Sequence, residues 1–411
     1  MDLQNLQENS PQLLSYMEEN GYSSIYISKI RREIERIVAE AQTKGWTLYA
    51  DVYQEYVGRL TSKINIRAKR TFLGILKNFD ELGQYPNGLR RQTIVERGKY
   101  HLLNHEYKSF IDYYCAVEKE RGKKDSTIYG ESHNAACFMY DLQQAGYDSF
   151  GSVTEAAVLS FFISSDGKPC RGYSYKKNIA AVLKACITID SETFSRILAF
   201  LPAFREKRKN VQYLKPEEIA ALKGLYAEKE PLISFRDKAI GILALHTGLR
   251  CCDIAGLKMK AIDWEGEHLY ILQQKTNAPL ELPLTATVGN AIFDYLRFER
   301  PVSDIEYVFI SKNRPYGRMK DKSIGNISNT IMNAANIRLS PGDRRGFHIF
   351  RHYLATELLG NDVPQPVISK VVGHTDPDSL GPYLRADFKH LKECALSIDK
   401  FPMPKGVLGN V

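Results

Sequence analysis

The sequence predicts a mainly α-helical protein with a small antiparallel β-sheet in its second half. Apolar residues recur at helical spacing through most of residues 10–200, as in the stripe Ile27, Ile30, Ile34 and Ile37. One stretch alternates instead: HLYILQQ, a turn that carries Lys275 at its tip, and LELPL are together typical of a β-hairpin. A chain of 411 residues is expected to form two or three domains.

Breaks in the helical pattern suggest where these domains begin and end. Ser10-Pro11 is interpreted as the start of the first helix, because proline is tolerated at the first helical position. In the second half, YVFIS at 307–311 predicts a further short strand. The expected parts are an N-terminal helical bundle at 1–98, a second helical domain at 105–203, a basic linker at 204–212, a mixed α+β domain at 213–398 and a tail at 399–411.

The composition narrows the class of protein without deciding it. The hydrophobic fraction of 44% and the charged fraction of 25% are typical of a globular protein. No apolar run is long enough to span a membrane, and the polar N-terminus does not resemble a signal peptide. The seven cysteines are odd in number and scattered, which favours reduced thiols in the cytoplasm. A net charge of +8 permits nucleic-acid binding but does not require it.

The chemistry-bearing residues gather between Phe347 and Tyr383. His348 and Arg351 are three residues apart and therefore share one face of a helix. A second apolar helix leads to His374, and Tyr383 follows nine residues later. Two imidazoles, a guanidinium and a phenol in this order suggest chemistry on a phosphodiester, in which Arg and His hold the phosphate oxygens and Tyr attacks phosphorus.

The motifs of the second half, taken in order, resemble those of the tyrosine recombinases of the phage integrase family. The segment TGLRCCDIAGL at 247–257 is similar to the first arginine motif of that family, and Lys275 stands at the expected hairpin tip. HIFRH at 348–352, VGH at 372–374 and Tyr383 follow at the expected distances. The resemblance covers about 105–398 and makes 105–203 a core-binding domain and 213–398 the catalytic domain. It implies a catalytic site formed by Arg250, Lys275, His348, Arg351, His374 and Tyr383.

The resemblance also implies what these side chains do. Tyr383 attacks phosphorus to give a covalent 3′-phosphotyrosyl link, although a phenol with a pKa near 10 is a weak nucleophile until it loses its proton. His348 accepts that proton or holds the phosphate, and Lys275 protonates the departing 5′-oxygen. The two arginines and His374 stabilise charge on the phosphoryl oxygens. No cofactor or metal is expected, because these cationic groups supply the charge stabilisation.

Further expectations concern partners and location. The chain is expected to close as a clamp around double-stranded DNA, to assemble as a homo-tetramer on synapsed sites, and to lie in the cytoplasm with the nucleoid rather than in a membrane. The N-terminal bundle is either an extra DNA-binding domain or an assembly module, and the basic segment with Arg67, Lys69 and Arg70 mildly favours DNA. The biological role suggested is recombination for a mobile element.

Other interpretations of the same residues stay open at this point. A type IB DNA topoisomerase would share the constellation but act as a monomer. A DNA-binding regulator with an inert site is a second alternative. His348 and His352 are four residues apart, as in some metal pairs, but no glutamate or third ligand accompanies them. Gly381-Pro382 directly precedes Tyr383 and suggests that the tyrosine lies at the start of a helix.

Overall fold

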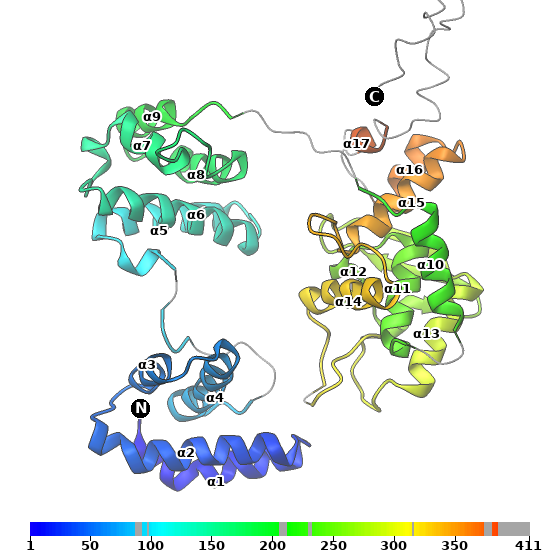
Figure 1. The fold of residues 1–411 in the computed structure, drawn as a ribbon, viewed down its shortest axis with the longest axis horizontal. Coiled ribbons are helices and arrows are strands. Elements are labelled where there is room, and N and C mark those ends of the chain that lie inside the picture. The colour runs from blue at the N-terminus through cyan, green and yellow to red at the C-terminus, as the bar shows by residue number, and fades with distance from the viewer. Residues whose placement is uncertain are drawn as a thin grey trace, which may run out of the picture. The chain divides into compact units, whose positions relative to one another are not determined.

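The computed structural model describes residues 1–86, 93–96, 98–204, 212–228, 232–314, 316–373 and 380–384 (Figure 1). The chain divides into two compact units. The first includes Met1–Ser10, Arg32–Tyr85 and residues 98–204, and the second includes Pro11–Arg31 and residues 212–384. The predicted fold class is confirmed: the described part is mostly helical and contains one three-stranded antiparallel sheet.

The N-terminal helices pack through apolar stripes such as the one predicted at Ile27, Ile30, Ile34 and Ile37, all of which are buried. The expected start at Ser10-Pro11 is wrong, because the first helix begins at Leu3 and contains Pro11 in its interior. Buried apolar residues on both sides of the proline hold one continuous helix despite the missing N–H group. The helices are α1 (Leu3–Glu19), α2 (Ser24–Lys44), α3 (Tyr49–Arg59) and α4 (Lys63–Leu82).

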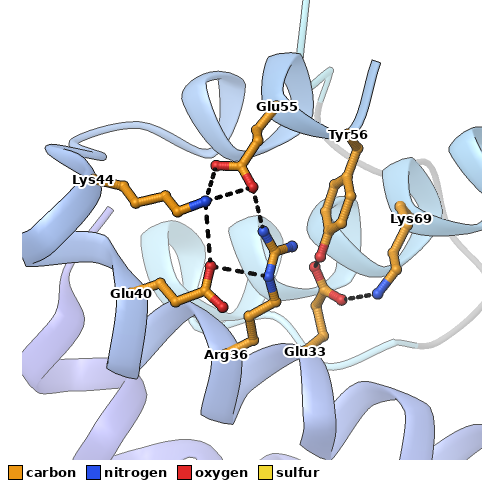
Figure 2. Close-up of polar contacts among 7 residues, drawn as sticks. All are labelled: Glu33, Arg36, Glu40, Lys44, Glu55, Tyr56 and Lys69. Carbon is orange, nitrogen blue, oxygen red and sulfur yellow. Dashed lines mark hydrogen bonds and ion pairs between the residues drawn. The ribbon is translucent and has the colours of Figure 1, made fainter. Parts of the chain in front are cut away.

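A polar network joins α2, α3 and α4 (Figure 2). The Glu33 side chain is fully buried and accepts hydrogen bonds from the Tyr56 hydroxyl and from Lys69 Nζ. Beside it, the Arg36 guanidinium binds Glu55 at 2.8 Å and lies 4.5 Å from the centre of the Tyr56 ring. A buried carboxylate is tolerated only when it is bonded in this way.

The second helical region has its own hydrophobic core, whose buried residues lie between Leu103 and Leu201. Aromatic rings dominate it: Phe150 contacts Tyr107, Phe138 and Phe194. Its elements are η1 (Tyr100–Leu102), α5 (His105–Glu120), α6 (Asp125–Gln144), η2 (Phe150–Ser152), α7 (Glu155–Phe162), α8 (Tyr173–Cys186) and α9 (Ser191–Phe200).

A separate core has buried residues from Leu214 to Phe350, with α11 at its centre. This helix packs against α13, α14 and α15, and its residues from Ala239 to Leu245 are buried on nearly all sides. The helices here are α10 (Pro216–Ala227), α11 (Phe235–Thr247), α12 (Cys251–Ala255), η3 (Met259–Ala261), α13 (Ala286–Phe298), α14 (Asp321–Ala334), α15 (His348–Gly360), α16 (Gln365–Val372) and α17 (Gly381–Leu384).

The predicted hairpin is present as β2 (His268–Leu272) and β3 (Pro279–Pro283), with β1 (Ile262–Asp263) along the other side of β2. Leu269 pairs with Leu282 and Ile271 with Leu280, so both strands turn one apolar face to the core. The strand expected at 307–311 is wrong. Tyr307 forms an isolated β-bridge with Lys258, and Ile310 forms another with Arg318. The apolar residues between them are buried in the core but do not belong to a hydrogen-bonded strand pair.

Candidate functional site

Arg250 is held at the junction of two helices. The first of them, α11, ends at Gly248, whose left-handed φ of 61° turns the chain, and Arg250 then serves as the N-cap of α12. Its guanidinium donates from Nη1 to Oε1 of Gln273 at 3.0 Å and from Nη2 to the Gly373 carbonyl at 3.2 Å. These bonds connect Arg250 with the hairpin and with the end of α16.

Arg351 reaches the same turn from α15. Its side chain is buried, and Nη1 donates to the Gly248 carbonyl at 3.0 Å. A Cβ atom on Gly248 would meet the Leu354 side chain at 3.0 Å and the Arg351 Cα at 3.6 Å, so α15 lies directly against the turn. The two predicted arginines are 101 positions apart in the sequence, yet they meet at one turn. Arg250 stands at the end of this turn, and Arg351 binds the carbonyl of Gly248 at its start.

Lys275 is exposed at the tip of the hairpin, as predicted. The turn closes with a bond from the Gln273 N–H to the Ala278 carbonyl at 3.0 Å, and Asn277 adopts a left-handed φ of 54°. His348 is the first residue of α15 and is also exposed. Together with the two arginines, these residues come from three separate parts of the chain.

The positive charges that act on His348 include those of the other three residues. Desolvation of the imidazole by the surrounding protein lowers the pKa of His348 below its ordinary value. The pKa is lowered further by four positive charges, those of Arg351, Arg250, Lys275 and Arg344. Because the imidazole remains neutral at neutral pH, it is able to accept a proton. A group of cations that favours a neutral base is suited to an anionic substrate such as a phosphodiester.

The remaining two predicted residues are described less fully. His374 lies outside the described residues. Tyr383 lies in the one-turn helix α17, which begins two positions earlier at Gly381, and its side chain lies outside the described part. The structure therefore brings together Arg250, Lys275, His348 and Arg351, and the places of the other two in the site stay predictions.

Nearby thiols do not compete with the predicted nucleophile. Burial, followed by the neighbouring Cys252, raises the pKa of Cys251 to about 11, so this thiol stays protonated at neutral pH. Among the described residues, no group of three or more His, Cys, Asp or Glu side chains is arranged to hold a metal ion. His348 and His352 instead stack their rings, with centroids 6.3 Å apart.

Sequence reasoning missed Gln273 and the contacts of its neighbour Gln274. The Gln274 N–H donates to Oδ1 of buried Asp253 at 2.8 Å, and its side-chain amide donates to the Cys252 carbonyl at 2.9 Å. These contacts dock the Lys275 turn on α12. A pair of glutamines before a hairpin lysine carries no motif of its own, so the sequence offered no signal for them.

Comparison with known proteins places this chain among the DNA recombinases. The model of the phage integrase family matches residues 212–390. The integrase/recombinase-like protein y4gC of Sinorhizobium fredii is 36% identical over 185 residues, which make up 45% of this chain and 94% of that protein. The chain spans 40% of the length of two further integrase/recombinase-like proteins of the same organism, y4rF and y4rA.

Two solved structures share the fold. The XerH site-specific recombinase bound to a palindromic difH substrate aligns with a TM-score of 0.54 at 17% identity, over 67% of this chain and 81% of that one. A lambda integrase tetramer bound to a Holliday junction aligns with a TM-score of 0.50 at 19% identity, over 67% and 79%. The chain belongs to the phage integrase family of tyrosine recombinases, which are DNA strand-transferring enzymes. The resemblance inferred from the sequence motifs is confirmed.

Proposed function

We propose that this recombinase cleaves and rejoins DNA strands through a covalent 3′-phosphotyrosyl link formed by Tyr383, in the service of a mobile element. The observation that best supports the proposal is that Arg250 and Arg351 meet at the turn around Gly248, with the Lys275 hairpin bonded to Arg250 through Gln273 and His348 on the same helix as Arg351. Family membership sets the reaction class, and the side chains suggest how the reaction proceeds.

In the first step, the Tyr383 oxygen forms a bond to phosphorus as the bond to the 5′-oxygen breaks. The phenolic proton passes to His348, whose neutral imidazole is able to accept it. Lys275 supplies a proton to the departing 5′-oxygen. The products are a 3′-phosphotyrosyl ester and a free 5′-hydroxyl, with no net gain or loss of electrons.

Charge stabilisation in this step is assigned to Arg250, Arg351 and His374. A guanidinium presents several N–H donors in one plane, and such donors fit the non-bridging phosphoryl oxygens. Loss of an arginine in such a role costs about 10³-fold or more in rate. A 5′-hydroxyl from another strand reverses the attack, so exchange needs no nucleotide hydrolysis.

We further propose that the partner is double-stranded DNA and that the working form is a homo-tetramer on synapsed sites. The XerH structure is a complex with its difH substrate, and the lambda integrase structure is a tetramer on a Holliday junction, which supports both points. In the described residues, no helix is both long and apolar enough to cross a bilayer. Because the proposed partner is DNA, we also propose that the protein lies in the cytoplasm with the nucleoid.

Trapping the covalent link tests the proposal. The full chain is incubated with a pool of random-sequence DNA duplexes, denatured with SDS, and the protein-linked fragments are isolated and sequenced. We expect an adduct that Tyr383→Phe abolishes and that Tyr353→Phe, a matched change in α15, leaves intact. The sequenced fragments then define the target duplex.

Two results would count against the proposal. Failure of the wild-type chain to form an adduct that depends on Tyr383 would overturn the nucleophile assignment. Relaxation of supercoiled plasmid without strand exchange between two copies of the trapped duplex would favour a type IB topoisomerase instead.

A further inference from the structure

Gln273 is a fully buried polar residue at the base of the Lys275 turn, with 0% of its surface exposed. Its Oε1 accepts hydrogen bonds from Arg250 Nη1 at 3.0 Å and from the Thr276 hydroxyl at 2.9 Å. Burial of an amide costs free energy unless its polar atoms are bonded, so an apolar residue would be the expected occupant of a purely structural position.

The other side of the Gln273 amide lies against the end of α16. A Cβ atom built on Gly373 would come within 1.9 Å of Gln273 Nε2, and Gly373 has a left-handed φ of 61°. The Gly373 carbonyl in turn accepts the second bond of Arg250, at 3.2 Å. One side chain therefore touches both the Arg250 guanidinium and the backbone that leads into position 374.

The hairpin itself is fixed next to this contact. Asp253, which is 2% exposed, binds the Gln274 N–H at 2.8 Å, and the Gln274 amide binds the Cys252 carbonyl. The turn that carries Lys275 is thus docked on the helix that Arg250 opens. Gln273 stands where three separate segments with proposed catalytic residues meet.

We infer that Gln273 is a positioning residue, which orients Arg250 toward the scissile phosphate through a neutral acceptor; the inference rests on the proposed function. A carbonyl oxygen directs the guanidinium N–H vectors while leaving its full positive charge available to the phosphate. A carboxylate in the same place would pair with the guanidinium and compete with the phosphate for it. The identity of the residue therefore matters as well as its size.

The test uses the duplex trapped by the wild-type chain and measures single-turnover cleavage. Gln273→Met keeps the volume but removes the acceptor, and we expect cleavage to slow by about 10-fold to 100-fold, the value of a hydrogen bond to a charged group. Gln273→Glu keeps the shape and the acceptor, and we expect it to slow cleavage at least as much. Gln365→Met, an exposed glutamine in α16, is the matched control and should cleave as the wild type does.

A double-mutant cycle with Arg250→Lys separates positioning from a general loss of structure. In the Arg250→Lys background, Gln273→Met should change the rate by less than about threefold, because the group that it orients is gone. Noncovalent binding of the same duplex is also measured for the wild type, the two single variants and the double variant. If Arg250→Lys cleaves too slowly to measure, the binding constants still give the interaction free energy between positions 250 and 273. Melting temperatures check that each variant is folded.

Three outcomes would overturn the inference. Equal slowing by Gln273→Met in both backgrounds would mean that Gln273 does not act through Arg250. Wild-type cleavage by Gln273→Glu would remove the argument for a neutral acceptor. If the wild-type chain forms adducts and every Gln273 variant cleaves normally, this inference alone is wrong. If no Tyr383-dependent adduct forms at all, the proposed function is wrong as well.

Discussion

At the scale of single residues, the site is governed by how cations are placed around one imidazole. His348 is exposed, yet the protein around it and the charges of Arg351, Arg250, Lys275 and Arg344 hold its pKa below the ordinary value. The cations proposed to bind the phosphate thus also favour the unprotonated form of the proposed base. In the proposed mechanism, substrate binding and readiness for proton transfer are therefore coupled through the same side chains.

Removing one of these charges should change the pH dependence of cleavage. Arg344→Gln takes away a positive charge without removing a proposed catalytic group, so the pKa of His348 should rise toward its ordinary value. Because the neutral imidazole is the active form, the acid limb of the rate profile should move to higher pH. Single-turnover rates measured across the pH range give the position of that limb, independently of any change in the plateau.

The exposed Lys260→Gln serves as the control for this experiment, since it removes an equal charge from η3 and is not among the main charges that act on His348. An acid limb that stays in place in Arg344→Gln, or that moves equally in Lys260→Gln, would contradict the electrostatic argument.

Residue types and spacing pointed to Arg250, Lys275, His348 and Arg351, because each belongs to an ordered motif with a chemical reason for its residue type; their catalytic roles stay predictions. Gln273 could not be predicted. Its proposed role depends on contacts with Arg250 and Gly373, the latter 100 positions away, and no local pattern encodes such a contact.

At the scale of helices and strands, the apolar periodicity predicted most elements, and its failures have physical causes. At Pro11, the buried stripe of α1 outweighed the local preference of proline for a helix start. At 307–311, a short apolar run with a buried centre was indistinguishable from a strand, because periodicity does not separate the two in so short a run. Long-range packing decided both cases.

The network around Glu33 modifies the prediction for the N-terminal bundle. Lys69 was expected to contribute to a DNA-binding segment, but its ammonium group binds the buried Glu33 carboxylate (Figure 2). The basic residues of that segment left to support DNA contact are therefore Arg67 and Arg70. Whether the bundle binds DNA or mediates assembly stays a prediction.

Lys69→Met should loosen this bundle. It leaves the Glu33 carboxylate buried with one fewer charged donor, which should lower the local free energy of unfolding by about 2 kcal/mol. Hydrogen–deuterium exchange of peptides from α2, α3 and α4 in the full chain measures that free energy locally. Lys63→Met, an exposed lysine on the same helix, is the control. Equal protection in the two variants would show that the Lys69 contact adds no stability.

At the scale of the whole molecule, two helical parts fold around separate cores, one between Leu103 and Leu201 and the other between Leu214 and Phe350. The sequence between them contains Arg205, Lys207, Arg208 and Lys209, which lie outside the described residues. Separate cores joined by a basic segment are consistent with the expectation of a clamp around DNA, in which the linker passes along the backbone. That expectation stays a prediction, since it concerns how the parts are arranged on a duplex.

The salt dependence of DNA binding tests the linker directly. The variant replaces four basic residues with glutamine: Arg205, Lys207, Arg208 and Lys209. It should bind the trapped duplex more weakly than the wild type does. The slope of log K against log salt concentration should become less steep by about 0.9 for each phosphate that these side chains neutralise in the wild type. The matched control exchanges arginine for lysine and lysine for arginine at the same four positions, which preserves the charge and should preserve the slope. Titrations at several salt concentrations, in the Tyr383→Phe background to prevent cleavage, give both slopes. An unchanged slope in the glutamine variant would place these four charges away from the DNA backbone and remove the linker from the proposed clamp.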